Sequence, residues 1–523
     1  MIKIKGKNLF LKSNSKTAII WQDAAYSYDD ILKNVNYYST LFSKAEKIAV
    51  FSENRPEWIY AFYAGWKNGA IVVPVDFLAS AEEVAFILND CQPEEIFCSA
   101  KTRDTLNEAL KSVGHKYNIH CFEDQTYQVN DFSAEEFEID DIMKTAAIIY
   151  TSGTTGSPKG VMLSFDNILA NVEAVTDGIP IYTDFRTVLA LLPYHHVFPL
   201  MGAMIAPLNA GGKIAFSPSI KPEDILETLQ KNAVNLIIGV PRLYAAFHKS
   251  IMDKINAHFI TKALFKTAKL INSRAFSKFI FKTVHRKFGG HVEYMISGGA
   301  KLDEDVARDF KALGFEMLEG FGMTEAAPMI TFTRPGKWVI GSAGQALPGL
   351  DVKIKDGEII ARGRNIMQGY YNRPEETAEV LKDGWLHTGD LGSIDKDGYL
   401  YVTGRKKEII VLSSGKNVNP EEAEKKLRSF SDFISDVGVF MHDDEIKAAF
   451  FPNLKEVYEK KIPNLAKHIQ EEIINKYNKQ VSYYKRISNF LILHKELPKT
   501  RLGKLQRFKL SKLANKFRFN KQD

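Results

Sequence analysis

Residues 151–160 carry the side chains of this chain best suited to hold an anion. They read TSGTTGSPKG and follow an apolar, β-favouring run that ends at Tyr150. Glycines let backbone N–H groups approach a phosphate closely, and hydroxyl and ammonium groups add further donors. We therefore predict a strand that leads into a phosphate-binding loop, with contacts from Thr151, Ser152, Gly153, Thr154, Thr155, Gly156 and Lys159.

The spacing of this loop differs from the common nucleotide motif G-x-x-x-x-G-K-[ST]. The fifth residue after Gly153 is Pro158, and Lys159 is followed by Gly160. A P-loop kinase or GTPase is therefore disfavoured. Taken alone, the segment also fits a flexible Gly/Ser surface loop.

Four later apolar runs also lead directly into unusual loops. The runs span 188–192, 236–240, 292–296 and 315–319. The loops after them begin at Pro193, Pro241, Ser297 and Gly320. Ligands of open α/β sheets collect at the carboxyl ends of strands, so we expect these loops and the phosphate loop to converge on one crevice.

The last two of these loops supply parts for a nucleotide. Gly298 and Gly299 leave room for a flat ring against the backbone, and Phe321 offers that ring a stacking face. Thr324 can donate to a phosphate oxygen, whereas the carboxylate of Glu325 suits phosphates only with Mg²⁺ between them. The predicted nucleotide contacts here are Gly298, Gly299, Ala300, Gly320, Phe321 and Gly322.

On its own, GFGMTE (320–325) reads as a plain turn, but together with the phosphate loop it resembles the adenylate-forming (AMP-binding) superfamily. That superfamily includes acyl-CoA synthetases, luciferases and peptide-synthetase adenylation domains. The resemblance implies ATP and Mg²⁺, with Thr151 and Glu325 as metal ligands and Thr324 and Glu325 in the catalytic site. It also places His196 beside the acyl site, whereas His195 stands where relatives more often have an aromatic residue.

Asp390 is a candidate for the ribose of ATP. We expect it to end a β-segment, where one carboxylate can accept hydrogen bonds from both hydroxyls of a diol; a turn-stabilising role is the alternative. The segment 385–390 resembles the family's W-x-x-T-G-D motif. By the same resemblance Arg405 contacts the ribose, and Lys407 is the residue about which a small domain swings.

The family pattern implies two domains in an α/β protein. We predict a large domain over 1–406, with α/β sheets and a β-rich subdomain, and a small mobile α+β domain over 407–523. The PKTRLGK run at 498–504 resembles the family motif that assigns Lys504 as a catalytic cation on this mobile domain. Swinging of that domain would bring the loop at Gly415 to the site and open a channel for a thiol.

The expected activity is a two-step ligation. A carboxylate and Mg-ATP would give acyl-adenylate and pyrophosphate, after which CoA would displace AMP. Features such as Leu191-Leu192-Pro193 and the basic insert resemble the long-chain fatty acid branch. Medium-chain or aryl acids, an acyl-carrier-protein synthetase or acyl-AMP ligase, and a non-catalytic binding protein are the alternatives.

The segment 249–290 holds ten Lys/Arg and a single acid, Asp253. Apolar residues interleave at spacings near three and four, which predicts basic amphipathic helices. Ordinary surface helices and a membrane-facing role are both consistent with this pattern, while no base-reading motif favours nucleic acid. Without a terminal apolar stretch, we expect a cytoplasmic protein with reduced cysteines, and peripheral contact with the inner face of the membrane through 249–290 is the alternative.

Overall fold

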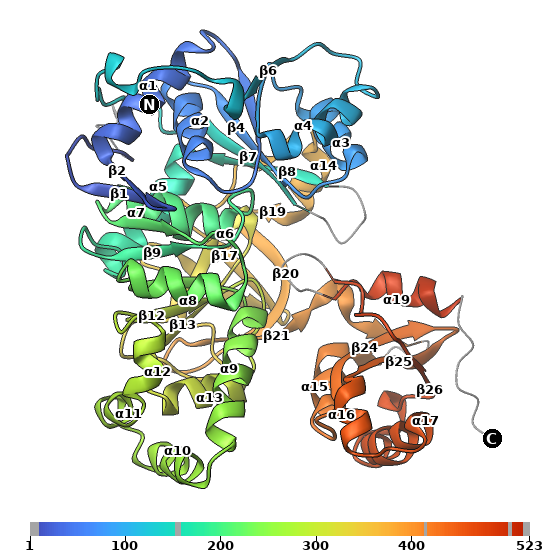
Figure 1. Ribbon diagram of the computed structural model, residues 1–523. Coiled ribbons are helices and arrows are strands. Elements are labelled where there is room, and N and C mark those ends of the chain that lie inside the picture. The colour runs from blue at the N-terminus through green and yellow to red at the C-terminus, as the bar shows by residue number, and fades with distance from the viewer. Residues whose placement is uncertain (1–9, 152–157, 413–415, 500–504, 516–523) are drawn as a thin grey trace. The chain divides into compact units, whose positions relative to one another are not determined.

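The computed structural model describes residues 10–151, 158–412, 416–499 and 505–515. The chain divides into two compact units. Unit 1 comprises Met1–Lys353, Ile360–Thr388 and Ile394–Leu400, and unit 2 comprises Ile354–Ile359, Gly389–Ser393 and Tyr401–Asp523. Both are mixed α/β, which confirms the predicted fold class (Figure 1). The boundary at 406/407 stays a prediction.

A seven-stranded sheet lies in the first half of unit 1. In spatial order its strands are β18 (Gly369–Tyr370), β8 (Lys159–Ser164), β7 (Thr145–Thr151), β4 (Ile71–Val75), β3 (Lys47–Phe51), β5 (Glu95–Cys98) and β6 (Asn118–Cys121). The pairs from β6 to β7 are parallel, and β8 and β18 are antiparallel. Around it lie α1 (Tyr28–Thr40), α2 (Pro56–Lys67), α3 (Ala81–Cys91) and α4 (Ala100–Leu110) (Figure 1). Every residue of β3 is buried, as expected for a strand covered on both faces.

A nine-stranded sheet forms the rest of the unit 1 scaffold. Its order is β15 (Gln345–Ala346), β14 (Met329–Phe332), β13 (Met317–Gly322), β12 (Tyr294–Ser297), β11 (Leu236–Gly239), β9 (Thr187–Ala190), β10 (Lys213–Phe216), β1 (Thr17–Trp21) and β2 (Ala24–Ser27). The strands from β13 to β1 run parallel. Because β9, β11, β12 and β13 are consecutive in this order, the four predicted strand-end loops leave one edge side by side.

Two strand ends differ from the prediction. β9 stops at Ala190, so Leu191 and Leu192 already belong to the loop. β13 continues through Gly322 because Gly320 and Phe321 pair antiparallel with β14, so the glycines of GFGMTE lie in a strand and not in a turn.

Helices of the basic segment pack in one hydrophobic core with strands of the nine-stranded sheet. They are α9 (Pro241–Asn256), α10 (Phe259–Ile271), α11 (Arg274–Ile280) and α12 (Lys282–Lys287), packed near α8 (Pro222–Lys231) and α13 (Glu304–Ala312). The expected helices are therefore present. None of the described helices is long and apolar enough to span a membrane.

The β-rich segment after residue 350 forms a five-stranded sheet. Its path is β16 (Asp351–Lys355), β17 (Glu358–Arg362), β20 (Trp385–Ile394) and β19 (Leu381–Lys382), with β21 (Leu400–Arg405) paired to β20. Asp390 lies in the middle of β20, so the expectation that it ends a β-segment was wrong. Strand residues precede and follow Asp390, so it does not lie in a turn.

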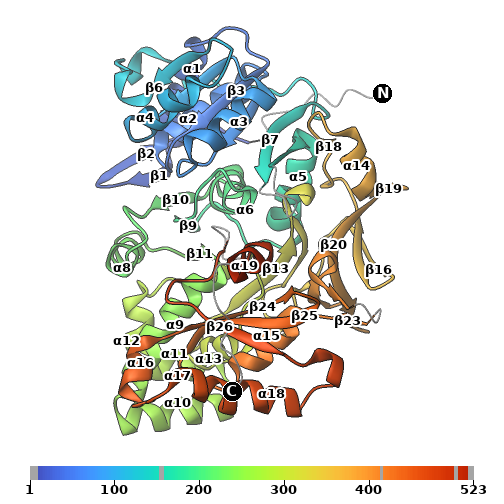
Figure 2. The ribbon, with the colours of Figure 1, turned by 90° about the vertical axis from the view of Figure 1, so that its right-hand side faces the viewer.

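Unit 2 contains a three-stranded sheet of β24 (Ile434–His442), β25 (Glu445–Pro452) and β26 (Asn489–Ile492). Alternate residues face opposite sides: Val439 and Phe450 join a cluster with α15 (Pro420–Arg428), whereas Phe440 and Ala449 pack with α19 (Arg507–Ala514). Figure 2 shows these helices on the two sides of the sheet. A helical stretch from α17 (Leu465–His468) to α18 (Asn475–Lys479) completes the predicted α+β arrangement.

Candidate active site

The two ends of the phosphate loop are fixed by β7 and β8. Thr151 pairs with Lys159 across this antiparallel hairpin, and the hydroxyl of Thr151 donates to the Lys159 carbonyl at 3.5 Å. Ser152, Gly153, Thr154, Thr155 and Gly156 lie outside the described residues. The strands therefore place the first and last predicted phosphate contacts next to each other.

Tyr370 connects this hairpin to Glu325. The Tyr370 hydroxyl donates to Oε1 of Glu325 at 2.7 Å, and Nζ of Lys159 lies 5.0 Å from the centre of the Tyr370 ring. Glu325 is only 8% exposed, and its carbonyl accepts from the Met367 N–H at 2.9 Å. β18, which carries Tyr370, pairs with β8 at Val161. Tyr370 thus links Lys159, on β8 of the seven-stranded sheet, to Glu325, which follows β13 of the nine-stranded sheet.

Burial and the nearby Glu325 carboxylate raise the pKa of Tyr370. The phenol therefore stays protonated and can act only as a donor toward that carboxylate. Sequence reasoning missed Tyr370, since nothing in its local sequence distinguishes it from Tyr371; only the pairing of β18 with β8 gives it this place.

Two buried amides hold the segment that follows Glu325. Nδ2 of Asn171, on α5 (Phe165–Glu173), donates to the Ala326 carbonyl at 3.0 Å, and its Oδ1 accepts from the Met329 N–H at 3.0 Å. Nδ2 of Asn365 donates to the carbonyls of Ala326 and Met329, both at 2.8 Å. These contacts fix the backbone on both sides of Ala327-Pro328. They were also missed, because both amides come from distant parts of the chain.

Glycine is required in the GFGMTE strand because other chain segments occupy the space of a side chain. A Cβ at Gly322 would lie 2.0 Å from the Pro328 carbonyl oxygen, and one at Gly320 would lie 2.9 Å from the Phe332 ring. Phe321 is partly buried against a small cluster that includes Ala326 and Ile330. The sharp hairpin formed this way places Thr324 at the start of the turn η5 (Thr324–Ala326).

The glycines after β12 have two different local roles. A Cβ at Gly298 would lie 2.9 Å from the ring of Phe198. In this structure the space beside Gly298 is therefore filled by Phe198, and not left free for the flat ring of a nucleotide. Gly299 has φ +83°, a conformation that side-chain-bearing residues rarely adopt, and a Cβ there would make only an ordinary contact of 3.8 Å with Val240. Ala300 after it is exposed. Nucleotide contact at these three residues stays a prediction.

The histidine loop after β9 is positioned by Asn54, from the turn before α2. Nδ2 of Asn54 donates to the Leu192 carbonyl at 2.8 Å, and its Oδ1 accepts from the Tyr194 N–H at 2.9 Å. Burial lowers the pKa of His196 to about 4 and that of His195 well below its usual range. Both imidazoles are therefore neutral near pH 7, and His196 can offer a hydrogen bond but no positive charge.

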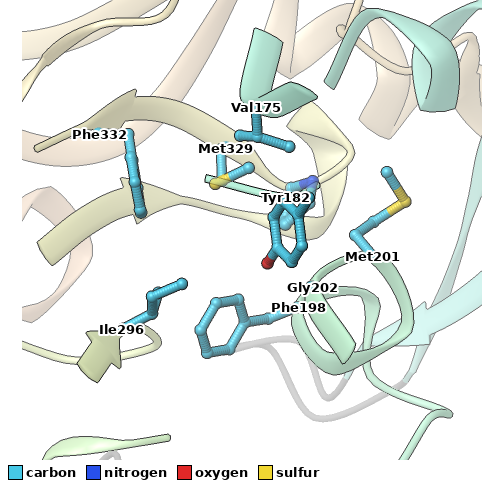
Figure 3. A pocket seen from close by; sticks show the side chains of 9 residues that line it. Val175, Tyr182, Phe198, Met201, Gly202, Ile296, Met329 and Phe332 are labelled. Atoms are coloured by element: carbon cyan, nitrogen blue, oxygen red, sulfur yellow. The ribbon is translucent and has the colours of Figure 1, made fainter. Parts of the chain in front are cut away.

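An apolar pocket lies between the histidine loop, the end of β12 and the hairpin after Glu325. Its free space is only about 10 Å³, which is room for about one water molecule, and Figure 3 shows Phe198, Tyr182 and Ile296 around it. The complete lining is Val175, Tyr182, Phe198, Met201, Gly202, Ile296, Pro328, Met329 and Phe332. No lining residue is charged, so the pocket is apolar, and its side chains must move apart to admit a group larger than a water molecule.

Asp390 and Arg405 form an ion pair within unit 2. Nε of Arg405 lies 2.9 Å from Oδ1 of Asp390 on the neighbouring strand, and the Asp390 side chain is 8% exposed. Arg405 thereby orients the carboxylate predicted to bind ribose. Lys407 lies in the short turn η6 (Lys406–Glu408) between β21 and β22 (Ile410–Val411), while Gly415 and Lys504 lie outside the described residues.

Glu319, directly before Gly320, is a buried carboxyl that sequence reasoning did not select. It is 7% exposed, pairs with Ser297 in the sheet register, and accepts a hydrogen bond from Nε1 of Trp338 at 3.1 Å. Burial raises its pKa to about 7. Between pH 4.5 and 7 the folded chain therefore holds a proton that the unfolded chain has lost, which makes folding less favourable as pH rises through this window.

We predict that Glu319→Gln removes this pH dependence. Relative to the unchanged protein, the variant should gain stability between pH 5 and 8, by up to about 3 kcal/mol for a carboxyl with this pKa. Thermal melting across that range measures the difference. Glu223→Gln, at an exposed carboxyl, is the matched control; parallel profiles for Glu319→Gln and the unchanged protein would contradict the assignment.

Two family models of known proteins match this chain, one in its larger N-terminal part and one in its C-terminal part. Residues 11–371 match the AMP-binding enzyme family, and residues 407–516 match the AMP-binding enzyme C-terminal domain. A long-chain-fatty-acid–CoA ligase of Bacillus subtilis is 28% identical, covering 95% of this chain and 91% of that protein. A feruloyl-CoA synthase of an Amycolatopsis species is 29% identical over 74% of this chain and 73% of its own length.

Among solved structures, ATP-bound MatB from Rhodopseudomonas palustris superimposes with a TM-score of 0.79 at 25% identity, covering 96% of each chain. The family models together account for most of the sequence and confirm the resemblance of the phosphate loop and the GFGMTE segment. The chain belongs to the AMP-binding enzyme family.

Proposed function

We propose that this protein activates a long-chain fatty acid as its acyl-adenylate and then transfers the acyl group to CoA. The protein is an AMP-forming acid–CoA ligase that uses ATP, Mg²⁺ and CoA. The observation that carries the proposal is the contact chain Lys159–Tyr370–Glu325, which joins the phosphate loop to the GFGMTE segment beside an apolar pocket.

Each part of the site has a role in the adenylation step. Lys159 and the phosphate loop would bind the phosphates of ATP. Glu325, with Thr151, is a hard oxygen donor that fits Mg²⁺, and Tyr370 leaves one carboxylate oxygen of Glu325 available for it. The metal would neutralise charge on the phosphates as pyrophosphate leaves.

Other residues would hold the remaining reactants. Asp390, oriented by Arg405, would accept hydrogen bonds from the ribose hydroxyls. Lys504 would contact both the acid and the α-phosphate, where a cation lowers the barrier for attack of one anion on another. Rotation about Lys407 would then withdraw Lys504 and bring the loop of Gly415 to the site for thioester formation.

The apolar pocket supports a hydrophobic acid. Its lining offers no charge to a second carboxylate, which argues against dicarboxylic substrates. Together with the long-chain-fatty-acid–CoA ligase among the relatives, this favours a fatty acid. The aromatic side chains of Tyr182, Phe198 and Phe332 narrow the pocket, and this specific feature favours a medium-chain or aryl acid as the second candidate.

A graded series of acids tests the proposed substrate. We expect pyrophosphate release to be fastest with long-chain fatty acids and to be accompanied by consumption of CoA. The assay measures pyrophosphate with and without CoA for short, medium and long saturated acids and for cinnamic acids. A maximum at medium-chain or aryl acids would select the second candidate, and release that ignores CoA but needs acyl carrier protein would make the enzyme an acyl-carrier-protein synthetase.

We predict that Tyr370→Phe lowers acid-dependent pyrophosphate release at least about tenfold, because one hydrogen bond to a charged group is lost while the ring under Lys159 remains. The Mg²⁺ concentration needed for half-maximal rate should rise. Tyr371→Phe, at the next residue, is the matched control and should leave both quantities unchanged. Equal values for Tyr370→Phe and the unchanged enzyme would show that Tyr370 does not position Glu325.

A further inference from the structure

The outer face of α10 is unusually apolar for a helix exposed to water. Phe259 is 86% exposed and Leu270 is 86% exposed, and Ile260 and Ile271 beside them are 71% and 49% exposed. The neighbouring helix α11 adds Phe279, which is 77% exposed. Several large apolar side chains are thus directed to solvent within one short segment.

These residues are distinct from those that attach α10 to the protein. Phe265 and Ala268 are buried and belong to the core under the nine-stranded sheet. At 100° per residue they lie on the side of the helix opposite Phe259 and Leu270, which share a stripe with Ala263 and Lys266. The helix therefore has two apolar faces, and packing on the core explains only the inner one. Figure 1 shows α10 at the end of unit 1 farthest from α1.

The segment that carries this outer face is strongly basic. All ten Lys/Arg of 249–290 are exposed. Lys269 pairs with Asp309 and Arg274 with Glu316. Among the residues that the structure describes, no carboxylate pairs with Lys254, Lys262, Lys266, Lys278, Lys282, Arg286 or Lys287. Most of the positive charge is consequently available to an external anion.

We propose that α10 and α11 form a docking surface for an anionic lipid bilayer. Phe259 and Leu270 lie eleven residues apart, about 16 Å along the helix axis, so they can enter the headgroup region together with the helix parallel to the membrane. Lys266 lies within this stripe and Lys262 on its flank, where both contact anionic headgroups. No described helix could cross a bilayer, so the contact is peripheral.

A bilayer fits this surface better than a protein partner does. The apolar side chains project from a convex helix, whereas an apolar patch that binds a folded protein is matched by a complementary surface of fixed shape. A fluid interface adapts to scattered apolar side chains, and its surface charge complements the unpaired lysines. The inference concerns binding alone and does not depend on which acid the enzyme activates.

Vesicle co-sedimentation tests the proposal with the full chain. Vesicles of phosphatidylcholine with phosphatidylglycerol should bind the protein, and vesicles of phosphatidylcholine alone should bind it much more weakly. Lys262→Gln with Lys266→Gln should lower the partition coefficient at least about tenfold, and this difference should shrink at high salt. Phe259→Ser with Leu270→Ser should lower it about tenfold at any salt concentration.

Matched controls separate this surface from general charge and hydrophobicity. Ile220→Ser removes an apolar side chain that is 77% exposed elsewhere on unit 1, and Lys116→Gln removes an exposed charge. Both should bind vesicles like the unchanged protein. Melting temperature and pyrophosphate release with a water-soluble acid should be the same in all variants, so a loss of folding or of ligase activity is recognised separately.

Three results would overturn the proposal. The first is equal binding to vesicles with and without anionic lipid, and the second is full binding by both double variants. The third is binding of the unchanged protein to an acidic carrier protein but not to vesicles, with loss in the double variants. That last result would make α10 a site for an acidic protein.

Discussion

The buried carboxylate of Glu325, linked through Tyr370 to Lys159 at the end of the predicted phosphate-binding loop, is the constraint on which the rest of unit 1 depends. Glu325 carries negative charge where ATP would bring more, so it is useful only if its position is fixed and a cation can stand between the two. The Tyr370 hydroxyl fixes one of its oxygens, and Lys159 lies on the Tyr370 ring. Residues from the seven-stranded sheet and from the nine-stranded sheet must therefore lie next to each other at this carboxylate.

The surrounding contacts fix the backbone segments on either side of Glu325 and in the histidine loop. Asn171 and Asn365 hold the backbone after Glu325, and Gly322 allows the hairpin to close against Pro328. On the other side, Asn54 holds the histidine loop, whose Phe198 fills the space left by Gly298. The apolar pocket lies between these two supported segments. Amide side chains are well suited to such support, since each can donate and accept at once.

The sequence predicted the parts that depend on local pattern. Apolar runs leading directly into unusual loops predicted the strands β7, β9, β11, β12 and β13. The last four are adjacent and parallel in the nine-stranded sheet, which places their loops at one edge. Lysine-rich segments with apolar spacing predicted α9 to α12. The family motifs supplied the chemistry that loop composition alone left open.

Local sequence patterns could not predict contacts between residues far apart in the chain. Tyr370 and Glu325 are 45 residues apart, and the strand pairing that joins them involves only two residues of β18. Asp390 was expected to end a β-segment, but β20, which pairs with β21, continues past it to Ile394. Periodicity also could not separate the two apolar faces of α10, because which face is covered depends on α13 and the core beneath.

A crystal structure of the protein with Mg²⁺ and a non-hydrolysable ATP analogue tests the central claim most directly. The account predicts that the metal lies within ligand distance of a Glu325 oxygen, that Tyr370 still donates to the other, and that Lys159 contacts a phosphate. A nucleotide bound away from the β7–β8 hairpin, or a metal held without Glu325, would contradict it.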